Sequence, residues 1–155
     1  PCLVPGQWGR THCPPHFLLT IFCYKAVMEM GLKTLHKEIF PAGTEIFSEG
    51  VQGNRAYVIE TGKVAIWRTI SGQRQTLGVL SNGSIFGEMA LIDNEPRMAS
   101  ASAVTETVCI VIGEGVFKKK LEDADPFLVG LLRIFMRNIR SLTENSELKQ
   151  QEPGS

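Results

Sequence analysis

Between residues 43 and 87 the chain alternates short apolar runs with glycines, which stand at positions 43, 50, 53, 62, 72, 78, 83 and 87. Glycine at this density marks turns between short strands. The runs at 56–59, 64–70 and 76–80 are rich in β-branched and aromatic residues, as strands are. With turns at 60–62 and 71–73, the pattern predicts an antiparallel β-barrel of the double-stranded β-helix or jelly-roll type. Two more strands are expected at 99–106 and 107–112.

A helical pattern replaces this one after Gly113. Residues 114–121 predict a short helix, and Asp125 followed by Pro126 is typical of a helix start, with the aspartate as the cap. Farther on, apolar residues recur at spacings of 4, 3, 4 and 3, which places them on one helix face: Leu128, Leu132, Phe135, Ile139 and Leu142. This stripe is too short for a free-standing coiled coil.

The predicted fold class is therefore mainly β with C-terminal helices. A length of 155 residues with 43% hydrophobic content suits one domain. We expect this domain over 31–145, with the barrel at about 38–112 and the helices at about 114–145. Residues 1–30 form an N-terminal segment whose status stays open, and 146–155 form a polar tail that is expected to fray.

Charge and cysteine usage narrow the range of partners. Sixteen Lys and Arg balance sixteen Asp and Glu, so no global field draws the protein to nucleic acid or to an acidic membrane. No apolar run approaches the ~20 residues that span a bilayer. Cys109 lies in the apolar run 108–112 and is expected to be a small buried hydrophobe, which suits a reduced, cytoplasmic protein. We expect no direct nucleic-acid binding and no membrane association.

The candidate chemistry argues against an enzyme. A metal-dependent barrel enzyme needs histidines clustered on its strands, whereas His12, His16 and His36 all precede the predicted barrel. The barrel sequence also offers no nucleophile–base pair. We therefore expect no catalytic residue, no metal ion and no cofactor.

The segment 86–100 carries the most specific signal. Glu88 follows Gly87 in Phe-Gly-Glu-Met-Ala-Leu, and Arg97 stands nine positions later in Pro-Arg-Met-Ala-Ser. A carboxylate accepts hydrogen bonds from sugar hydroxyls, a guanidinium grips a phosphate with a planar fork, and glycine lets the backbone approach a ligand. These groups predict a pocket for a ribose that bears a phosphate, although in isolation they would also fit a surface ion pair beside a core turn.

This segment resembles the phosphate-binding cassette of the cyclic nucleotide-binding domain family, which includes the regulatory subunits of cyclic-AMP-dependent kinase and the bacterial catabolite activators. The likeness extends in order from about residue 41 to about residue 142. It implies that Arg97 holds the cyclic phosphate, that Glu88 accepts from the ribose 2′-hydroxyl, and that the amides of Ala90 and Met98 face the phosphate. The predicted binding residues are Gly87, Glu88, Met89, Ala90, Arg97, Met98 and Ala99.

Cyclic AMP is favoured as the ligand, and cyclic GMP is the second candidate. Family members that bind cyclic GMP typically carry threonine after the arginine, where this chain has Met98. Leu77, Val79 and Leu80 are candidates for an apolar wall against the base, although strand residues at this spacing also fit plain core. The resemblance to catabolite activators places Thr143 near the adenine.

The sequence thus predicts a regulatory sensor in which a cyclic nucleotide biases the position of the helix at 128–142. The same helix is a candidate homodimer surface, and the effector that reads the signal is unknown. Two alternatives stay open. One is the ligand-sensing part of a catabolite-activator-type transcription regulator without its DNA-binding domain. The other is a ligand-free scaffold domain of a larger channel, kinase or transporter.

Overall fold

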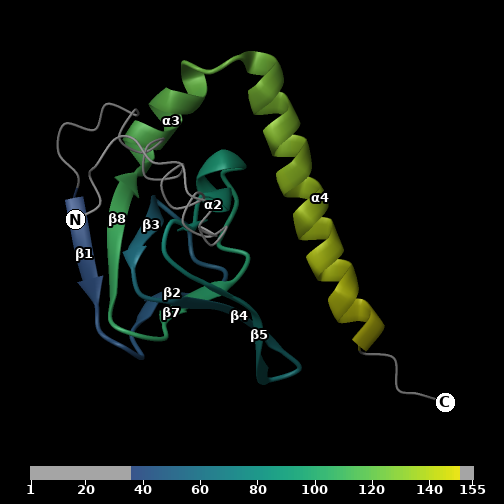
Figure 1. The fold of residues 1–155 in the computed structure, drawn as a ribbon. Coiled ribbons are helices and arrows are strands. Elements are labelled where there is room, and N and C mark those ends of the chain that lie inside the picture. The colour runs from purple at the N-terminus through teal and green to yellow at the C-terminus, as the bar shows by residue number, and fades with distance from the viewer. Residues whose placement is uncertain (1–35, 151–155) are drawn as a thin grey trace, which may run out of the picture.

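Two four-stranded antiparallel sheets form the computed structural model, which describes residues 36–150 (Figure 1). The first sheet has the order β1-β8-β3-β6 and consists of His36–Phe40 (β1), Thr107–Gly113 (β8), Arg55–Thr61 (β3) and Ile85–Phe86 (β6). The second has the order β2-β7-β4-β5 and consists of Glu45–Phe47 (β2), Ser100–Ala103 (β7), Val64–Ile70 (β4) and Gln73–Leu80 (β5). The predicted fold class, mainly β with C-terminal helices, is confirmed.

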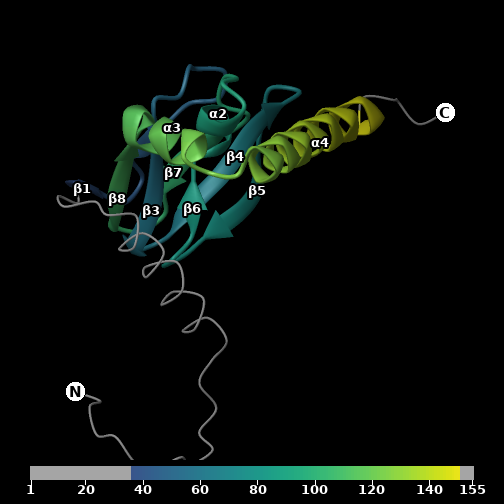
Figure 2. The same ribbon diagram turned by 90° about the horizontal axis from the view of Figure 1, so that it is seen from above.

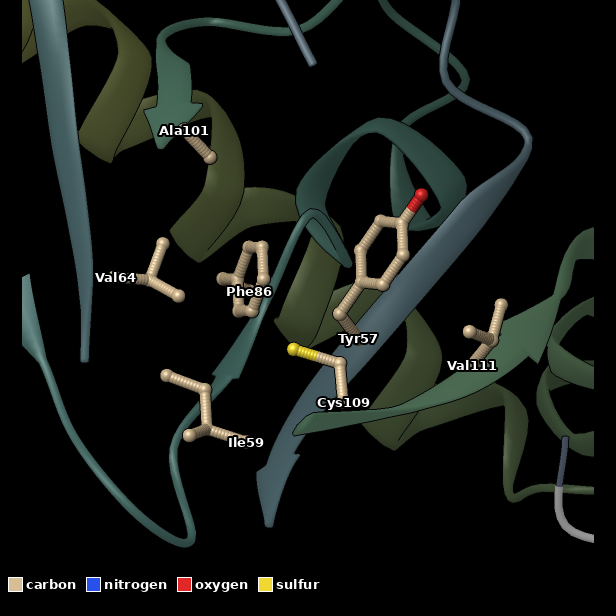
Figure 3. Packing of buried hydrophobic residues seen from close by; sticks show 7 residues of the cluster. All are labelled: Tyr57, Ile59, Val64, Phe86, Ala101, Cys109 and Val111. Carbon is tan, nitrogen blue, oxygen red and sulfur yellow. The ribbon is translucent and has the colours of Figure 1, made fainter. Parts of the chain in front are cut away.

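The main core lies between the two sheets, because strands from both contribute to it. Phe86 stacks on Tyr57 with the ring centroids 5.2 Å apart, and Phe47 stacks on both rings, at 6.1 Å from Tyr57 and 5.9 Å from Phe86. Figure 3 shows the buried members of this cluster, which are Tyr57, Ile59, Val64, Phe86, Ala101, Cys109 and Val111.

Strands β3 and β8 are buried on both faces. Successive strand residues point to opposite faces, so every second residue of these strands faces away from the main core. The outer residues form a second apolar cluster: Ala56, Val58, Leu91, Ile110 and Ile112. Two helices cover this face, α2 (Met89–Ile92) through Leu91 and α3 (Glu114–Glu122) through Phe117. The short helix α2 is therefore held on the sheet, which fixes the turn that precedes it.

The last helix, α4 (Pro126–Gln150), follows α3, and its C-terminal end projects beyond the strands of the barrel (Figures 1 and 2). The side chain of Asp125 accepts hydrogen bonds from the amides of Phe127 at 2.8 Å and Leu128 at 3.3 Å, so the predicted helix start is confirmed. Much of the apolar stripe is exposed, with Leu128 59% and Leu142 70% accessible. Among the described residues, no helix has both the length and the apolar character to cross a membrane.

The elements depart from the sequence prediction in several places. Strand β3 extends to Thr61 and β5 begins at Gln73, inside the turns predicted at 60–62 and 71–73. The predicted strand at 99–106 ends at Ala103, because residues 104–106 form an exposed turn in which Thr105 accepts from the amide of Lys63. Helix α4 runs to Gln150 instead of ending near 145, and no glycine or proline interrupts the sequence between residues 130 and 153. Strands β1, β2 and β6 were not predicted. The predicted segment at 1–30 lies outside the described residues.

Candidate functional site

The turn between β6 and α2 is built around Gly87, whose φ of +76° lies in the left-handed region. An L side chain rarely adopts this backbone conformation, and a Cβ here would lie 2.6 Å from Nη1 of Arg97. Glycine therefore turns the chain and leaves room for the guanidinium. Glu88 follows as the N-cap residue of α2, so the position of the sheet-bound helix fixes its backbone.

Arg97 lies in the loop that leads from α2 to β7, and both its backbone N–H and its backbone carbonyl are hydrogen-bonded. Its amide donates to the carbonyl of Val51 at 2.9 Å, and its carbonyl accepts from the amide of Gly50 at 2.8 Å. These bonds tie the loop to residues 50–51, which precede β3 along the chain. The start of the side chain is thus fixed by segments far apart in the sequence.

The guanidinium of Arg97 is buried, with 6% of the residue exposed. Nη2 donates to the carbonyl of Arg55 at 2.6 Å, and Nη1 donates to the carbonyl of Gly87. Cζ lies 4.1 Å from the centroid of the Phe47 ring, a cation–π contact. Nε is buried and has no hydrogen-bond partner. The Nε–H group of this cation is therefore left without an acceptor.

Glu88 and Arg97 bring opposite charges to a place that excludes much of the water. Burial raises the pKa of the Glu88 carboxyl, although a backbone hydrogen bond and the charge of Arg97 act the other way. Burial also lowers the pKa of Arg97, which Tyr57 and Glu88 partly offset, and an arginine stays protonated at neutral pH nonetheless. Both groups are poorly solvated and would gain from a ligand that offers a hydroxyl to one and an anion to the other.

A cavity of about 190 Å³ adjoins these two side chains. Its lining contains all seven residues predicted for the ligand site, which are Gly87, Glu88, Met89, Ala90, Arg97, Met98 and Ala99. The rest of the lining is apolar and comes from both sheets: Phe47, Ile66, Leu80, Ile85 and Phe86. The fold thus brings residues 87–90 and 97–99 together at one cavity with an apolar wall.

Of the four residues predicted near the base, Leu77, Val79, Leu80 and Thr143, only Leu80 lines this cavity. Leu77 and Val79 are 45% and 57% exposed and lie outside the lining. Side chains alternate along a strand, so Leu77 and Val79 point away from the face to which Leu80 points. The wall comes instead from residues that sequence reasoning missed, Phe47, Ile66, Ile85 and Phe86. Their apolar periodicity marks them as core and gives no sign of a cavity.

A second cavity of about 590 Å³ lies between α4 and the loop that carries Arg97. Thr143 lines this cavity and not the first one, and its hydroxyl donates to the carbonyl of Ile139 at 2.9 Å. Arg97 and Met98 line both cavities, so they separate the small hollow from the helix.

Arg140 of α4 fastens the helix to the cassette loop. Its Nε lies 2.5 Å from Oδ2 of Asp93, its Nη2 lies 3.1 Å from Oδ1, and its Nη1 donates to the carbonyl of Pro96 at 3.1 Å. The side chains of Arg140 and Asp93 are 18% and 12% exposed. Pro96 immediately precedes Arg97, so this helix clasp, formed by Arg140, Asp93 and Pro96, ends one residue from the cation of the site.

The described part of the chain shows few other reactive groups. Residues 36–143 contain no group of three or more His, Cys, Asp or Glu side chains placed to hold a metal ion. Cys109 is a free thiol in the main core, where burial raises its pKa to about 12. The small cavity thus offers one buried cation, one partly buried carboxyl and an apolar wall, which suit the binding of an anionic sugar.

Comparisons with known proteins point to one family. The sequence model of the cyclic nucleotide-binding domain matches residues 37–124. A cyclic AMP receptor protein of Thermus thermophilus is 37% identical over 86 residues, which are 55% of this chain and 40% of that protein. A CRP-like cAMP-activated global transcriptional regulator of Mycobacterium tuberculosis is 32% identical over 127 residues, which are 79% of this chain and 57% of that protein.

A solved structure agrees with these relatives. The cAMP-bound form of the EAL enzyme Bd1971 has a TM-score of 0.69 at 34% identity and covers 74% of this chain and 31% of its own. The cGMP-bound form of the same enzyme has a TM-score of 0.66 at 35% identity, with the same coverage. The chain therefore spans between about a third and just over half of the length of these proteins.

Proposed function

Because the chain belongs to the cyclic nucleotide-binding domain family, which it matches over residues 37–124, we propose that it is a non-catalytic sensor for cyclic AMP. The observation that carries this proposal is the state of Arg97. A buried cation whose Nε has no hydrogen-bond partner lies at a cavity that also holds a partly buried carboxyl. A cyclic nucleotide has an anion for the first group and a hydroxyl for the second.

The phosphate is the part of the ligand that Arg97 would hold. A guanidinium has five N–H donors, and the carbonyls of Arg55 and Gly87 each accept one of them. These carbonyls orient the planar group, while Nε keeps its hydrogen for a phosphate oxygen. Burial strengthens such a charge-assisted bond, which contributes about 1.5–3 kcal/mol.

The ribose would lie against Glu88. A carboxylate close to a phosphate would be repelled by it, so Glu88 must face the other side of the sugar, where the 2′-hydroxyl can donate to it. Without that hydroxyl, the partly buried carboxylate would lack one hydrogen-bond donor in the complex. A 2′-deoxy ligand should therefore bind more weakly by about tenfold or more, as expected for one lost bond to a charged group.

The base is recognised mainly by the apolar wall in this proposal. Phe47, Ile66 and Leu80 offer contact area but no polar group. Met98 also lacks the hydroxyl that threonine would offer to a guanine amino group, which favours cyclic AMP. We expect cyclic GMP to bind more weakly without being excluded, and the similar enzyme Bd1971 is described with either nucleotide bound.

The output would pass through the helix clasp. Arg140 connects α4 to Pro96, and Pro96 adjoins the arginine that a phosphate would engage. A ligand that prefers one position of the cassette loop thus also favours one position of α4, to the extent of its differential affinity. Amide exchange at residues 127–143 should slow when saturating cyclic AMP is added. Identical exchange with and without ligand would remove this part of the proposal.

The test of binding uses a titration calorimeter and a matched pair of arginine variants. Arg97→Gln should weaken cyclic AMP binding by about ten- to a hundredfold, because it removes the charge at the phosphate. Arg74→Gln is the control, since Arg74 also stacks on an aromatic ring, Trp67, at 4.1 Å, but lies outside the cavity. Equal affinities of the two variants would contradict the proposed role of Arg97.

There are two candidates for the activity that ligand binding would control in the whole protein. A relative that is named as a global transcriptional regulator favours a sensing part of such a regulator, whereas similarity to an EAL enzyme fits attachment to a different output. Both are compatible with ligand binding. A ligand-free scaffold domain is not, so the same titration separates it from the proposal.

A further inference from the structure

Gly53 lies in the loop before β3 and is buried beside the guanidinium of Arg97. A Cβ at this position would lie 2.6 Å from Cζ and 2.7 Å from Nε of Arg97, and 2.9 Å from Cβ of Ala90. Non-bonded carbon atoms prefer about 3.5–4.0 Å. The backbone of Gly53 lies outside the left-handed region, unlike that of Gly87. Glycine is therefore required at position 53 because a side chain would not fit there, and not because of its backbone conformation.

We propose that Gly53 is a positioning residue of the nucleotide site, because its missing side chain leaves the slot in which the Arg97 guanidinium lies. This inference rests on the proposed function. Three further groups complete the slot. The Phe47 ring lies 4.1 Å from Cζ, and the carbonyls of Arg55 and Gly87 accept from the two terminal nitrogens.

The slot and one of its acceptors come from the same short stretch of chain. Gly53 stands two residues before Arg55, where β3 begins. The segment that provides room for the guanidinium therefore also provides the carbonyl that orients it. A side chain at 53 would push Cζ and Nε away while the Arg55 carbonyl stays fixed in the sheet. The hydrogen bond to Arg55 and the direction of Nε would then be lost together.

The fold should tolerate such a change better than the site does. Two of the three atoms that a new Cβ would meet belong to the end of a long, flexible side chain, which can move. The third is Cβ of Ala90, at the first turn of α2, so the remaining displacement also falls on the cassette. Gly53→Ala should consequently lower nucleotide affinity more than stability.

The first measurement compares two glycine-to-alanine variants by titration with cyclic AMP. Gly53→Ala should weaken binding by about ten- to a hundredfold, the loss expected when a charged donor is misdirected. Gly115→Ala is the control, because a Cβ at Gly115 in α3 meets nothing within 4 Å. Wild-type affinity of Gly53→Ala, in a protein whose Gly115→Ala control also binds normally, would overturn the proposal.

The second measurement needs no nucleotide. Urea unfolding is followed for the wild type, Gly53→Ala, Arg97→Ala and the double variant. If the slot exists for Arg97, the alanine at 53 should lower the unfolding midpoint more when Arg97 is present than when Arg97 is truncated, since the clash with the guanidinium is then gone and only the contact with Cβ of Ala90 remains. This comparison also decides the case in which Gly53→Ala alone fails to fold, because the double variant should regain a cooperative transition.

The two measurements fail in different ways. Equal destabilisation by Gly53→Ala with and without the Arg97 side chain would overturn the slot, whatever the protein binds. The wild type could instead bind no nucleotide while the unfolding cycle shows the expected coupling. The proposed function would then fail. Gly53 would only provide space for Arg97 and have no role in binding, which would also overturn the positioning proposal.

Discussion

The helix clasp gives a prediction whose magnitude follows from its burial. Arg140 and Asp93 make two contacts, at 2.5 Å and 3.1 Å, with side chains 18% and 12% exposed, and Pro96 accepts a third bond at 3.1 Å. Exposed ion pairs contribute about 0.2–1 kcal/mol. Removing one partner of a fully buried pair costs about 3–5 kcal/mol. We place this partly buried, forked pair between them, with a coupling of about 1–2 kcal/mol.

The assay is a double-mutant cycle with Asp93→Asn, Arg140→Gln and the double variant. Asparagine at 93 keeps an oxygen for the amide of Glu95, which donates to Oδ1 of Asp93 at 3.2 Å, so the change acts mainly on the charge. Urea unfolding measures the coupling free energy, and hydrogen exchange at 127–143 measures the release of α4. A coupling of 1.4 kcal/mol corresponds to about tenfold faster exchange through local opening.

A matched pair on α3 provides the reference for this cycle. Glu114 and Lys118 form an ion pair at 2.5 Å, but their side chains are 40% and 45% exposed. Its coupling should stay near the ~0.3–0.5 kcal/mol typical of helical i,i+4 pairs. The reasoning is refuted if the Arg140–Asp93 coupling is no larger than this reference, or if the exchange of α4 is unchanged in all three variants.

Three further predictions concern the cavity and the core. Burial raises the pKa of the Glu88 carboxyl above its ordinary value of 4.5. The folded state therefore holds the carboxyl proton more tightly than the unfolded chain does, and the free energy of unfolding falls as pH rises through the folded-state pKa. Glu88→Gln should therefore stabilise the ligand-free protein in urea at neutral pH, lose this advantage below pH 4.5, and weaken cyclic AMP binding; a destabilised variant at neutral pH would oppose this. Leu80→Ala should weaken binding, whereas Val79→Ala, at a residue 57% exposed, should not; equal titration curves would count against the apolar wall. Burial raises the pKa of Cys109 to about 12, so peptide mapping after native alkylation near pH 8 should find it unmodified until urea is added, and rapid native labelling would contradict its place in the core.

The sequence predicted those parts of the fold that local patterns determine. The strands β3 and β4 contain runs of β-branched and aromatic residues between glycines, and Asp125 with Pro126 begins α4 as expected. Of β5, only the part at 76–80 was predicted, because residues 73–75 are polar. Strands β2 and β6 were missed because they contain three and two residues, too few for a period to be recognised. Strand β1 was missed because it begins with three polar residues and lacks the apolar run that marked the other strands. The places of β1, β2 and β6 depend on pairing with β8, β7 and β3, which is long-range information.

The candidate site divides in the same way. Glu88 and Arg97 were predicted because a carboxylate and a guanidinium near a glycine turn indicate a ligand by their chemistry. The acceptor on Arg55, the ring of Phe47 and the clearance at Gly53 were not, because each depends on which distant segment packs against Arg97. Thr143 was predicted from the resemblance to catabolite activators, and its side chain lies at the larger cavity beside α4.

Titration calorimetry of the unaltered protein with cyclic AMP tests the central claim most directly. The account predicts saturable heat with one nucleotide per chain, a weaker signal with 2′-deoxy cyclic AMP, and none with adenosine at the same concentration, since adenosine brings no phosphate to Arg97. Absence of heat for cyclic AMP and cyclic GMP at millimolar concentration, with a protein that unfolds cooperatively in urea, would contradict it.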